Sequence, residues 1–264
     1  MENQWEDFSF TVVAYKSSET YVVTNTEPIW ELIDEHLMKT VSMFNSPYIE
    51  FMRREVTAWK NGLLKLQDTL EEWENFQKSW QYLLPVFSSQ DIAEELPALA
   101  SKFSYIDEQW KALMKQVEQN PGVIDCCFGI PGLKDQLAFY NETLNLVRKS
   151  LNDYLNVKRK AFPRFYFLSN EELLTILSSS REISSVQSYI GKCFEGIGKM
   201  ILDKEYQILG MQSPDSEEVY FLEKVPIFKD RKSLNDVEDW MSVVQEKMVG
   251  GVRDLIEGSV EDKS

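Results

Sequence analysis

Residues 158–174 read Lys158-Arg159-Lys160-Ala161-Phe162-Pro163-Arg164-Phe165-Tyr166-Phe167-Leu168-Ser169-Asn170-Glu171-Glu172-Leu173-Leu174, and they divide the chain into two helical parts. The basic residues are typical of a helix C-terminus, and Pro163 prevents that helix from continuing. Ser169, followed three residues later by Glu172, predicts a capping box at the start of the next helix. We therefore expect a buried corner with a packing hub, made of Trp80, Phe162, Pro163, Phe165, Tyr166 and Phe167.

The basic residues of this corner form a cluster without an acidic neighbour, which comprises Lys158, Arg159, Lys160 and Arg164. Three interpretations remain open. Positive charge at a helix C-terminus complements the helix dipole. Alternatively, the cluster contacts an acidic partner surface, or Arg164 forms an internal latch across the corner through its forked guanidinium group.

Before the corner, apolar residues recur in alternating steps of three and four, which predicts long helices. The longest stripe comprises Met52, Val56, Trp59, Leu63, Leu66, Leu70, Trp73, Gln77, Trp80 and Leu84. Similar steps recur over residues 99–117 and 133–154. Such stripes favour nearly antiparallel packing at about 20°. We expect Pro85 to end the first helix and Gln77 to be partly exposed, although Gln77 could instead fix the register between helices.

Strands are predicted in two places by β-branched and aromatic residues. Residues 8–24 favour a hairpin, followed by a helix that Thr26 caps, and residues 207–222 favour a second hairpin. Helices are expected at about 170–180 and 185–201. A last helix is expected from near Ser233, with fraying after Gly250-Gly251 because glycine disfavours helix.

These patterns together predict a mainly α protein, an elongated bundle of long antiparallel helices with one or two small β-hairpins. We expect an N-terminal hairpin lead over residues 1–27 and a long-helix bundle over residues 28–161. A second helical block is expected over residues 162–264, with its hairpin near 207–222. The expected whole is one continuous rod that is truncated at its C-terminus.

Composition narrows the function classes. The formal net charge is −15 and the isoelectric point about 4.6, so a general nucleic-acid or anionic-membrane surface is disfavoured. The sequence has no run of about 18 apolar residues and no signal-peptide pattern at its start. The three cysteines, Cys126, Cys127 and Cys193, give no disulfide framework. We therefore expect a soluble intracellular protein.

Catalytic, cofactor and metal sites are not expected in this chain. His36 is the single histidine, which excludes His-dependent triads and multi-histidine metal sites, and we expect it at the surface. The run Gly196-Ile197-Gly198-Lys199 fails as a phosphate-binding loop because no Ser or Thr follows Lys199. Cys126-Cys127 lacks a basic neighbour in sequence, so a buried pair is favoured over a reactive one.

Two long segments resemble the linker region of dynein heavy chains. Residues 80–92, Trp80-Gln81-Tyr82-Leu83-Leu84-Pro85-Val86-Phe87-Ser88-Ser89-Gln90-Asp91-Ile92, are similar to the family pattern W-x-Y-L-E-P-I-F-S-S-x-D-I. Residues 152–155 and 158–174 are similar to the most recognisable block of that family. Leu84 departs from the pattern, since the family usually carries an acidic residue there. The resemblance covers nearly the whole chain and favours the axonemal type over the cytoplasmic type.

The resemblance implies a mechanical lever that transmits ATP-driven conformational change of a AAA+ ring as a power stroke along microtubules. It implies as partners the AAA+ ring of the same heavy chain and other dynein subunits, with no nucleic acid and no membrane. ATP and magnesium are expected in the ring and not in this chain, which is not itself an enzyme. The implied location is the cytoplasm and cytoskeleton, in the axoneme of a cilium or flagellum.

The rival interpretation is a static spectrin-like helical scaffold or interaction module. The long stripes alone support it equally well, but they share no repeat of side chains, and strands interrupt them. For a lever, we expect flexure near residues 122–132 or 162–170, where loops can absorb rotation.

Overall fold

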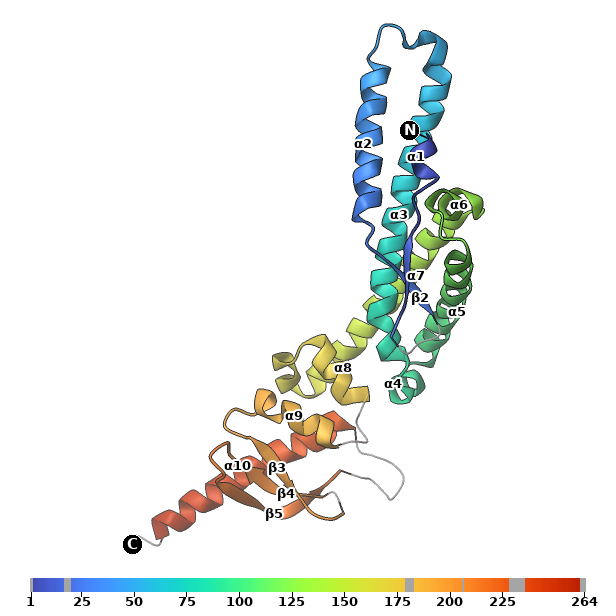
Figure 1. Ribbon diagram of the computed structural model, residues 1–264. Coiled ribbons are helices and arrows are strands. Elements are labelled where there is room, and N and C mark those ends of the chain that lie inside the picture. The colour runs from blue at the N-terminus through green and yellow to red at the C-terminus, as the bar shows by residue number, and fades with distance from the viewer. Residues whose placement is uncertain (1, 17–19, 179–182, 206, 228–235, 262–264) are drawn as a thin grey trace. The chain divides into compact units, whose positions relative to one another are not determined.

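The computed structural model describes residues 2–16, 20–178, 183–205, 207–227 and 236–261. It is mainly α-helical with small antiparallel sheets, as predicted (Figure 1). The chain forms two compact units. Unit 1 comprises residues 1–85 and 98–148, and unit 2 comprises residues 86–97 and 149–264. The chain therefore changes unit at positions other than the divisions expected at residues 27 and 161.

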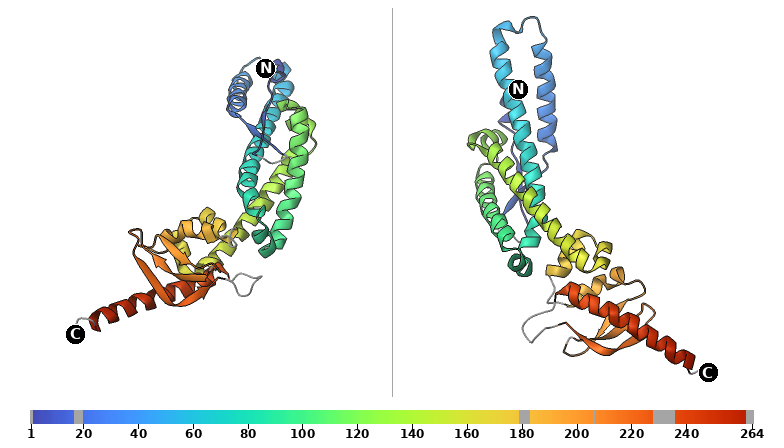
Figure 2. Two further views of the ribbon diagram at one scale, coloured as in Figure 1. Left: turned by 60° about the horizontal axis from the view of Figure 1, so that its bottom comes forward. Right: turned by 180° about the vertical axis from the view of Figure 1, so that it is seen from behind.

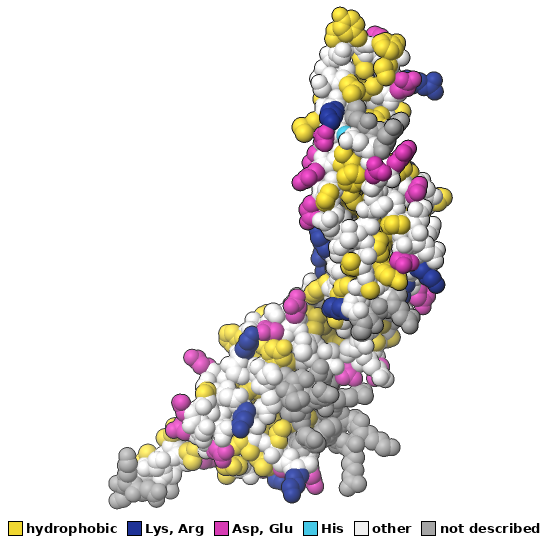
Figure 3. Space-filling view, viewed as in Figure 1, with side chains coloured by type: hydrophobic (Ala, Val, Ile, Leu, Met, Phe, Trp, Pro, Cys, Tyr) yellow, Lys and Arg dark blue, Asp and Glu magenta, His cyan; other side chains and the backbone are white. Residues whose placement is uncertain are grey.

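Unit 1 is a set of long helices with one hairpin. Its elements are α1 (Glu2–Trp5), β1 (Thr11–Ala14), β2 (Tyr21–Thr24), α2 (Glu27–Phe44), the 3₁₀ turn η1 (Ile49–Met52), most of α3 (Arg53–Phe87), α5 (Pro97–Gln119), α6 (Val123–Gly129) and the first half of α7 (Leu133–Ala161). Figure 1 shows α2 and α3 side by side, joined at their upper ends. The space-filling view shows apolar side chains at this end (Figure 3), where Tyr48 and Phe51 are 80% and 82% exposed.

The central helix of unit 1 is α3, and its stripe is buried from Val56 to Trp80 except for the partly exposed Trp59 and Gln77. Phe76 and Leu83, which lie outside the predicted stripe, are also fully buried. The reason is that α3 has neighbours on several sides. Phe10 of the N-terminal segment packs on Trp73, with ring centroids 5.3 Å apart. Trp110 of α5 and Tyr140 of α7 pack on Phe76, with ring centroids 4.8 Å and 6.0 Å from that of Phe76.

The predicted N-terminal hairpin is confirmed, with Thr11 opposite Thr24 and Val12 opposite Val23. Gln77 is partly exposed, as expected, and its side-chain amide bonds both polar groups of the Val23 backbone. Its Nε2 donates to the Val23 carbonyl, and its Oε1 accepts from the Val23 N–H, each at 2.8 Å. The polar member of the stripe thus fixes a strand against α3 rather than a second helix.

The predicted start of α2 after Thr26 is confirmed, but the predicted end of α3 at Pro85 is wrong. Thr26 does not cap α2 through its side chain, because its φ and ψ of −83° and −11° are already helical. Its Oγ1 instead donates to Oε1 of Glu74 at 2.7 Å. Pro85 does not end α3, which continues to Phe87. A proline removes one N–H from the helix, and in the last turn the remaining bonds tolerate that loss.

Unit 2 is a small α+β unit. Its elements are α4 (Gln90–Glu95), the second half of α7, the 3₁₀ turn η2 (Pro163–Phe167), α8 (Asn170–Ser178), α9 (Ile183–Cys193), β3 (Lys199–Leu202), β4 (Gln207–Gln212), β5 (Glu218–Pro226) and α10 (Val237–Glu261). The strands form an antiparallel sheet in the order β3-β4-β5. Helix α10 lies against β5, and α9 adjoins β3 (Figure 2).

The hairpin predicted near residues 207–222 is confirmed as β4 and β5, but the helix expected at about 185–201 is wrong. Helix α9 ends at Cys193, and Gly196, with φ of +81°, turns the chain into β3. This positive φ is a conformation that glycine adopts without strain. A third strand therefore replaces the last turns of the expected helix.

The last helix is longer than expected. Within the described residues α10 runs to Glu261, so the fraying predicted after Gly250-Gly251 is wrong, while the expected start at Ser233 lies outside the described residues. Gly251 is buried against β5, and a Cβ there would stand 3.6 Å from the Tyr220 carbonyl. Packing on the sheet outweighs the weak helix propensity of glycine.

Candidate functional site

The corner at residues 158–174 lies within unit 2 and begins where α7 ends. Pro163 opens η2, whose three residues per turn place every third side chain on one face. Phe162, Phe165 and Leu168 follow that spacing and are buried, and the rings of Phe162 and Phe165 meet edge to face at 4.9 Å. The predicted capping box is also present, since Glu172 N–H donates to Ser169 Oγ at 3.2 Å and Ser169 N–H donates to Glu172 Oε2 at 2.9 Å.

The predicted hub needs correction at four of its six members. Tyr166 and Phe167 are 60% and 68% exposed, because the 3₁₀ spacing turns them away from the face that carries Phe165. Pro163 is exposed as well. Trp80 is buried in the core of unit 1, where its Nε1 donates to Asp107 Oδ1 at 2.8 Å. Of the six residues predicted as one hub, Phe162 and Phe165 are thus the two that are buried together in unit 2.

Arg159 is the innermost of the basic residues, with 9% of its surface exposed. Its Nη2 donates to the Leu168 carbonyl at 3.0 Å, and its Nε donates to the Phe165 carbonyl at 3.4 Å. These carbonyls lie at the C-terminal end of η2, where the Phe165 carbonyl also accepts from the Leu168 N–H at 3.1 Å. A cation there also complements the negative end of the turn. Arg159 therefore ties the end of α7 to the chain that leaves the corner.

Arg164 joins three elements of unit 2. Its Nε donates to Oε1 of Gln245 on α10 at 2.7 Å, and its Nη1 donates to the carbonyl of Cys193 at 3.0 Å. Its guanidinium carbon lies 5.0 Å from the ring centroid of Phe194. The Cys193 carbonyl is at the C-terminus of α9, where a positive charge is favourable. These are the contacts that an internal latch would make, and all of them lie within unit 2.

Lys158 forms a largely buried ion pair with Glu238 in the first turn of α10. The Nζ–Oε1 distance is 2.6 Å, and the two side chains are 11% and 10% exposed. Burial alone would lower the pKa of Lys158. The bond to Glu238 and the negative charges of Glu238, Glu95 and Asp236 outweigh it, so the pKa of Lys158 is raised. The lysine is therefore charged at neutral pH, and the pair holds α10 against α7.

Lys160 is the one member of the predicted cluster with an exposed side chain. The other three direct their charges to partners inside unit 2, which weakens the case for a patch that contacts an acidic surface. Sequence reasoning did not find those partners, which are Glu238, Gln245 and the carbonyl of Cys193. Glu238 and Gln245 lie 80 and 81 positions from the basic residues they bond, and no local pattern links them.

The thiols and the histidine are structural rather than reactive. Cys126 and Cys127 are buried and free, and burial raises their pKa values to about 11 and about 12. His36, expected at the surface, is fully buried. Its Nδ1 accepts from Trp5 Nε1 at 3.0 Å, and its Nε2 lies 2.9 Å from Gln4 Oε1. The expectation failed because the N-terminal helix α1 covers α2 at this point.

Metal ligation and membrane insertion find no support in the described part of the chain. It contains no group of three or more His, Cys, Asp or Glu side chains placed to hold a metal ion. None of its helices combines the length and the apolar character that a membrane crossing requires.

Residues 1–259 match the family model described as dynein heavy chain, N-terminal region 2. The chain belongs to this dynein heavy chain family. It is 39% identical over 260 residues to dynein axonemal heavy chain 1 of Homo sapiens, a match that covers 98% of the chain and 6% of the relative. It is 36% identical over 261 residues to dynein axonemal heavy chain 3 of Homo sapiens, which covers 99% of the chain and 6% of the relative. It is 34% identical over 255 residues to dynein axonemal heavy chain 12 of Rattus norvegicus, a match that covers 97% of the chain and 8% of the relative.

The dynein heavy chain region described here spans a small share of these relatives, and the share belongs to their N-terminal region rather than to an ATPase ring. The resemblance to dynein is thereby confirmed, as is the prediction that this chain is not itself the ATPase. The two segments that carry the resemblance form particular elements of the dynein fold. Residues 80–92 form the end of α3 and the start of α4, and residues 152–174 form the end of α7, η2 and the first turn of α8.

Proposed function

We propose that this region acts as the linker of an axonemal dynein heavy chain, a mechanical lever between an ATP-driven AAA+ ring and the rest of the motor. The lever role is supported by helix α7, whose first half belongs to unit 1 and whose second half belongs to unit 2. Helix α7 is 29 residues long and continues without a break where the chain changes unit between Arg148 and Lys149. Its apolar face is buried on both sides of this position, at Leu144 and Val147 in unit 1 and at Leu151 and Leu155 in unit 2. A helix packed along its length resists bending and can transmit force.

The partners follow from this role and from the axonemal relatives. We expect the AAA+ ring of the same heavy chain and other dynein subunits as partners, in the axoneme of a cilium or flagellum. ATP and magnesium would be bound by the ring, and the isolated chain would bind neither. A titration of the chain with magnesium ATP tests this point, and saturable micromolar binding would contradict it.

Bending of such a lever requires positions where few packed side chains resist rotation. The chain changes unit at Pro85–Val86, Pro97–Ala98 and Arg148–Lys149. The segments proposed from sequence, residues 122–132 and 162–170, each lie within one compact unit instead. We therefore place the flexure at Pro85–Val86 and Pro97–Ala98, where the chain changes unit outside the packed helix α7.

The decisive experiment interrupts α7 in the whole heavy chain. A Gly-Gly-Ser insertion between Arg148 and Lys149 should abolish or strongly slow microtubule gliding while ATP hydrolysis by the ring continues, because a flexible helix dissipates the stroke. The matched control places the same insertion between Asp215 and Ser216, at an exposed turn between β4 and β5. Unchanged gliding with the α7 insertion would contradict the lever and favour the static scaffold.

A further inference from the structure

Unit 1 contains a recess of about 460 Å³ that the lever role does not explain. It is lined by Trp5, Glu6, Trp59, Gly122, Ile124 and Asp125. Backbone bonds hold its walls together: Phe10 N–H donates to the Pro121 carbonyl at 2.8 Å, and Val123 N–H donates to the Phe8 carbonyl at 3.1 Å. The N-terminal segment is therefore fixed beside α6, and the recess is a built feature of the fold.

Two indoles form part of the lining. Trp5 is 3% exposed and is held in place by its bond to His36, while Trp59 is partly exposed. Nε1 of Trp59 is buried and has no acceptor among the described residues. Trp73 and Trp110 share that feature, but they are 1% exposed in the closed core and line no described recess. Trp59 thus places a partly exposed aromatic ring in the lining of the recess.

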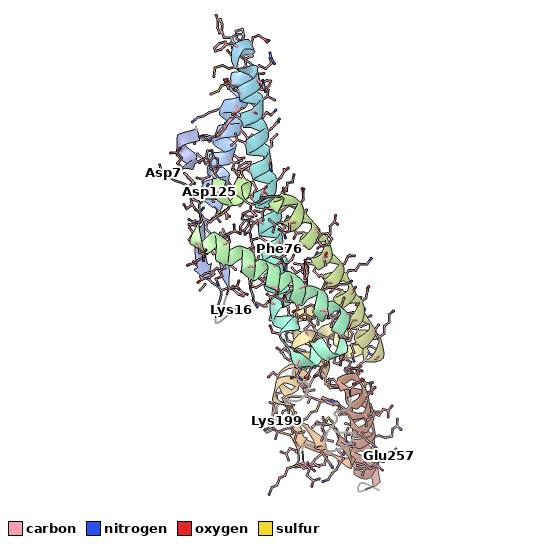
Figure 4. All side chains as sticks on the ribbon, turned by 90° about the vertical axis from the view of Figure 1, so that its right-hand side faces the viewer. Asp7, Lys16, Phe76, Asp125, Lys199 and Glu257 are labelled. Atoms are coloured by element: carbon pink, nitrogen blue, oxygen red, sulfur yellow. The ribbon has the colours of Figure 1, made fainter. Side chains whose placement is uncertain are left out.

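Two carboxylate side chains, those of Glu6 and Asp125, line the recess. Glu6 and Asp125 are exposed, and within the described ranges neither forms an ion pair. Asp7 follows Glu6, and Figure 4 shows Asp7 and Asp125 on the same side of the molecule. Asn120 Nδ2 donates to Asp125 Oδ2 at 3.3 Å. A Cβ on Gly122 would stand 3.2 Å from the same oxygen, so the glycine leaves room for this carboxylate.

We propose that this recess binds an arginine side chain presented by a partner protein. A guanidinium group stacks on aromatic rings and pairs with carboxylates through its planar fork, and an indole wall with carboxylates at the rim offers both contacts. The net charge of −15 also attracts basic partners. This interaction goes beyond the lever role and does not depend on it.

The test uses the 264-residue chain labelled with ¹⁵N and two small probes, N-acetyl-arginine amide and its neutral analogue N-acetyl-citrulline amide. The indole N–H signal of Trp59, assigned with Trp59→Phe, should shift saturably with the arginine probe at low salt. The citrulline probe should bind at least about tenfold more weakly, because it carries no charge for the carboxylates. Equal responses to the two probes, or no saturable response to the arginine probe, would overturn the proposal.

A pair of variants locates the binding. Glu6→Gln with Asp125→Asn should weaken the arginine response by about tenfold or more. The matched control, Glu108→Gln with Glu118→Gln, removes two exposed carboxylates from α5 and should leave the response unchanged. Undiminished binding in the first variant would refute the assigned site, as would an equal loss in the control.

Discussion

Unit 1 and the corner of unit 2 are stabilised in different ways. The core of unit 1 is aromatic, with Trp73, Trp80 and Trp110 all within 6 Å of a neighbouring ring and 1% exposed or less. The corner of unit 2 instead holds charged groups at low exposure, namely Arg159 on two carbonyls and Lys158 on Glu238. An apolar core is destabilised when a large side chain is replaced by a small one and a cavity remains. A buried charged group is destabilising when its partner is removed. The two regions should therefore fail under different substitutions.

The largest effect is expected from a cavity in unit 1. Trp110→Ala removes a side chain that contacts Trp73, Phe76 and Trp80, and should lower the free energy of unfolding by about 3–5 kcal/mol. Denaturant unfolding measures the loss, and hydrogen exchange should place it in unit 1. The control, Tyr105→Ala, truncates a 56% exposed side chain on the same helix. A loss below about 1 kcal/mol for Trp110→Ala would contradict an aromatic core of this kind.

The matching change in unit 2 removes a buried cation. Arg159→Ala removes the side-chain donor of the Leu168 carbonyl and one of the two donors of the Phe165 carbonyl, which should cost about 1.5–3 kcal/mol. Faster hydrogen exchange should be confined to unit 2. Lys160→Ala, at the next position and exposed, should change stability by less than about 0.5 kcal/mol. Equal effects of the two substitutions would show that Arg159 contributes only surface charge.

A smaller loss is expected at Arg164, which is less buried than Arg159. Arg164→Ala removes the hydrogen bonds to Gln245 and to the Cys193 carbonyl. The melting temperature of the chain should fall, and the free energy of unfolding should decrease by about 1–2 kcal/mol. Arg164→Lys keeps the positive charge but loses the forked guanidinium group, so its melting temperature should lie between those of the unchanged chain and Arg164→Ala. An unchanged melting temperature together with impaired movement of the motor would restore the partner-patch interpretation of this residue.

The smallest effect is a pH dependence in unit 1. Burial lowers the pKa of His36, so the unfolded chain binds a proton more readily than the folded chain. The stability that neutral His36 contributes is complete above the ordinary pKa of about 6.5 and is lost as the pH falls below it. The free energy of unfolding, measured between pH 7.5 and pH 5.5, should fall as the pH is lowered. In His36→Gln this fall should be smaller. Because His36 is the single histidine, an identical pH profile in the variant would refute this assignment.

The parts of this fold that depend on local pattern were predictable from sequence. The stripe along α3, the first hairpin and the Ser169–Glu172 capping box all follow from spacing over a few residues. The parts that depend on distant residues were not. His36 is buried because α1 covers it, and α10 continues through Gly250-Gly251 because β5 supports it. Tyr166 and Phe167 are exposed because a 3₁₀ turn, and not an α-helix, follows Pro163.

The central claim is that two separately stabilised units serve as the stiff parts of a lever. The most direct measurement is the structure of the whole heavy chain in two nucleotide states of its ring. The account predicts that unit 1 and unit 2 each superpose on themselves between the states, with the change concentrated at residues 85–86 and 97–98 and with α7 unbroken at residues 148–149. Rearrangement inside the Trp73–Trp80–Trp110 core, or bending confined to α3 between Val56 and Leu84, would contradict it.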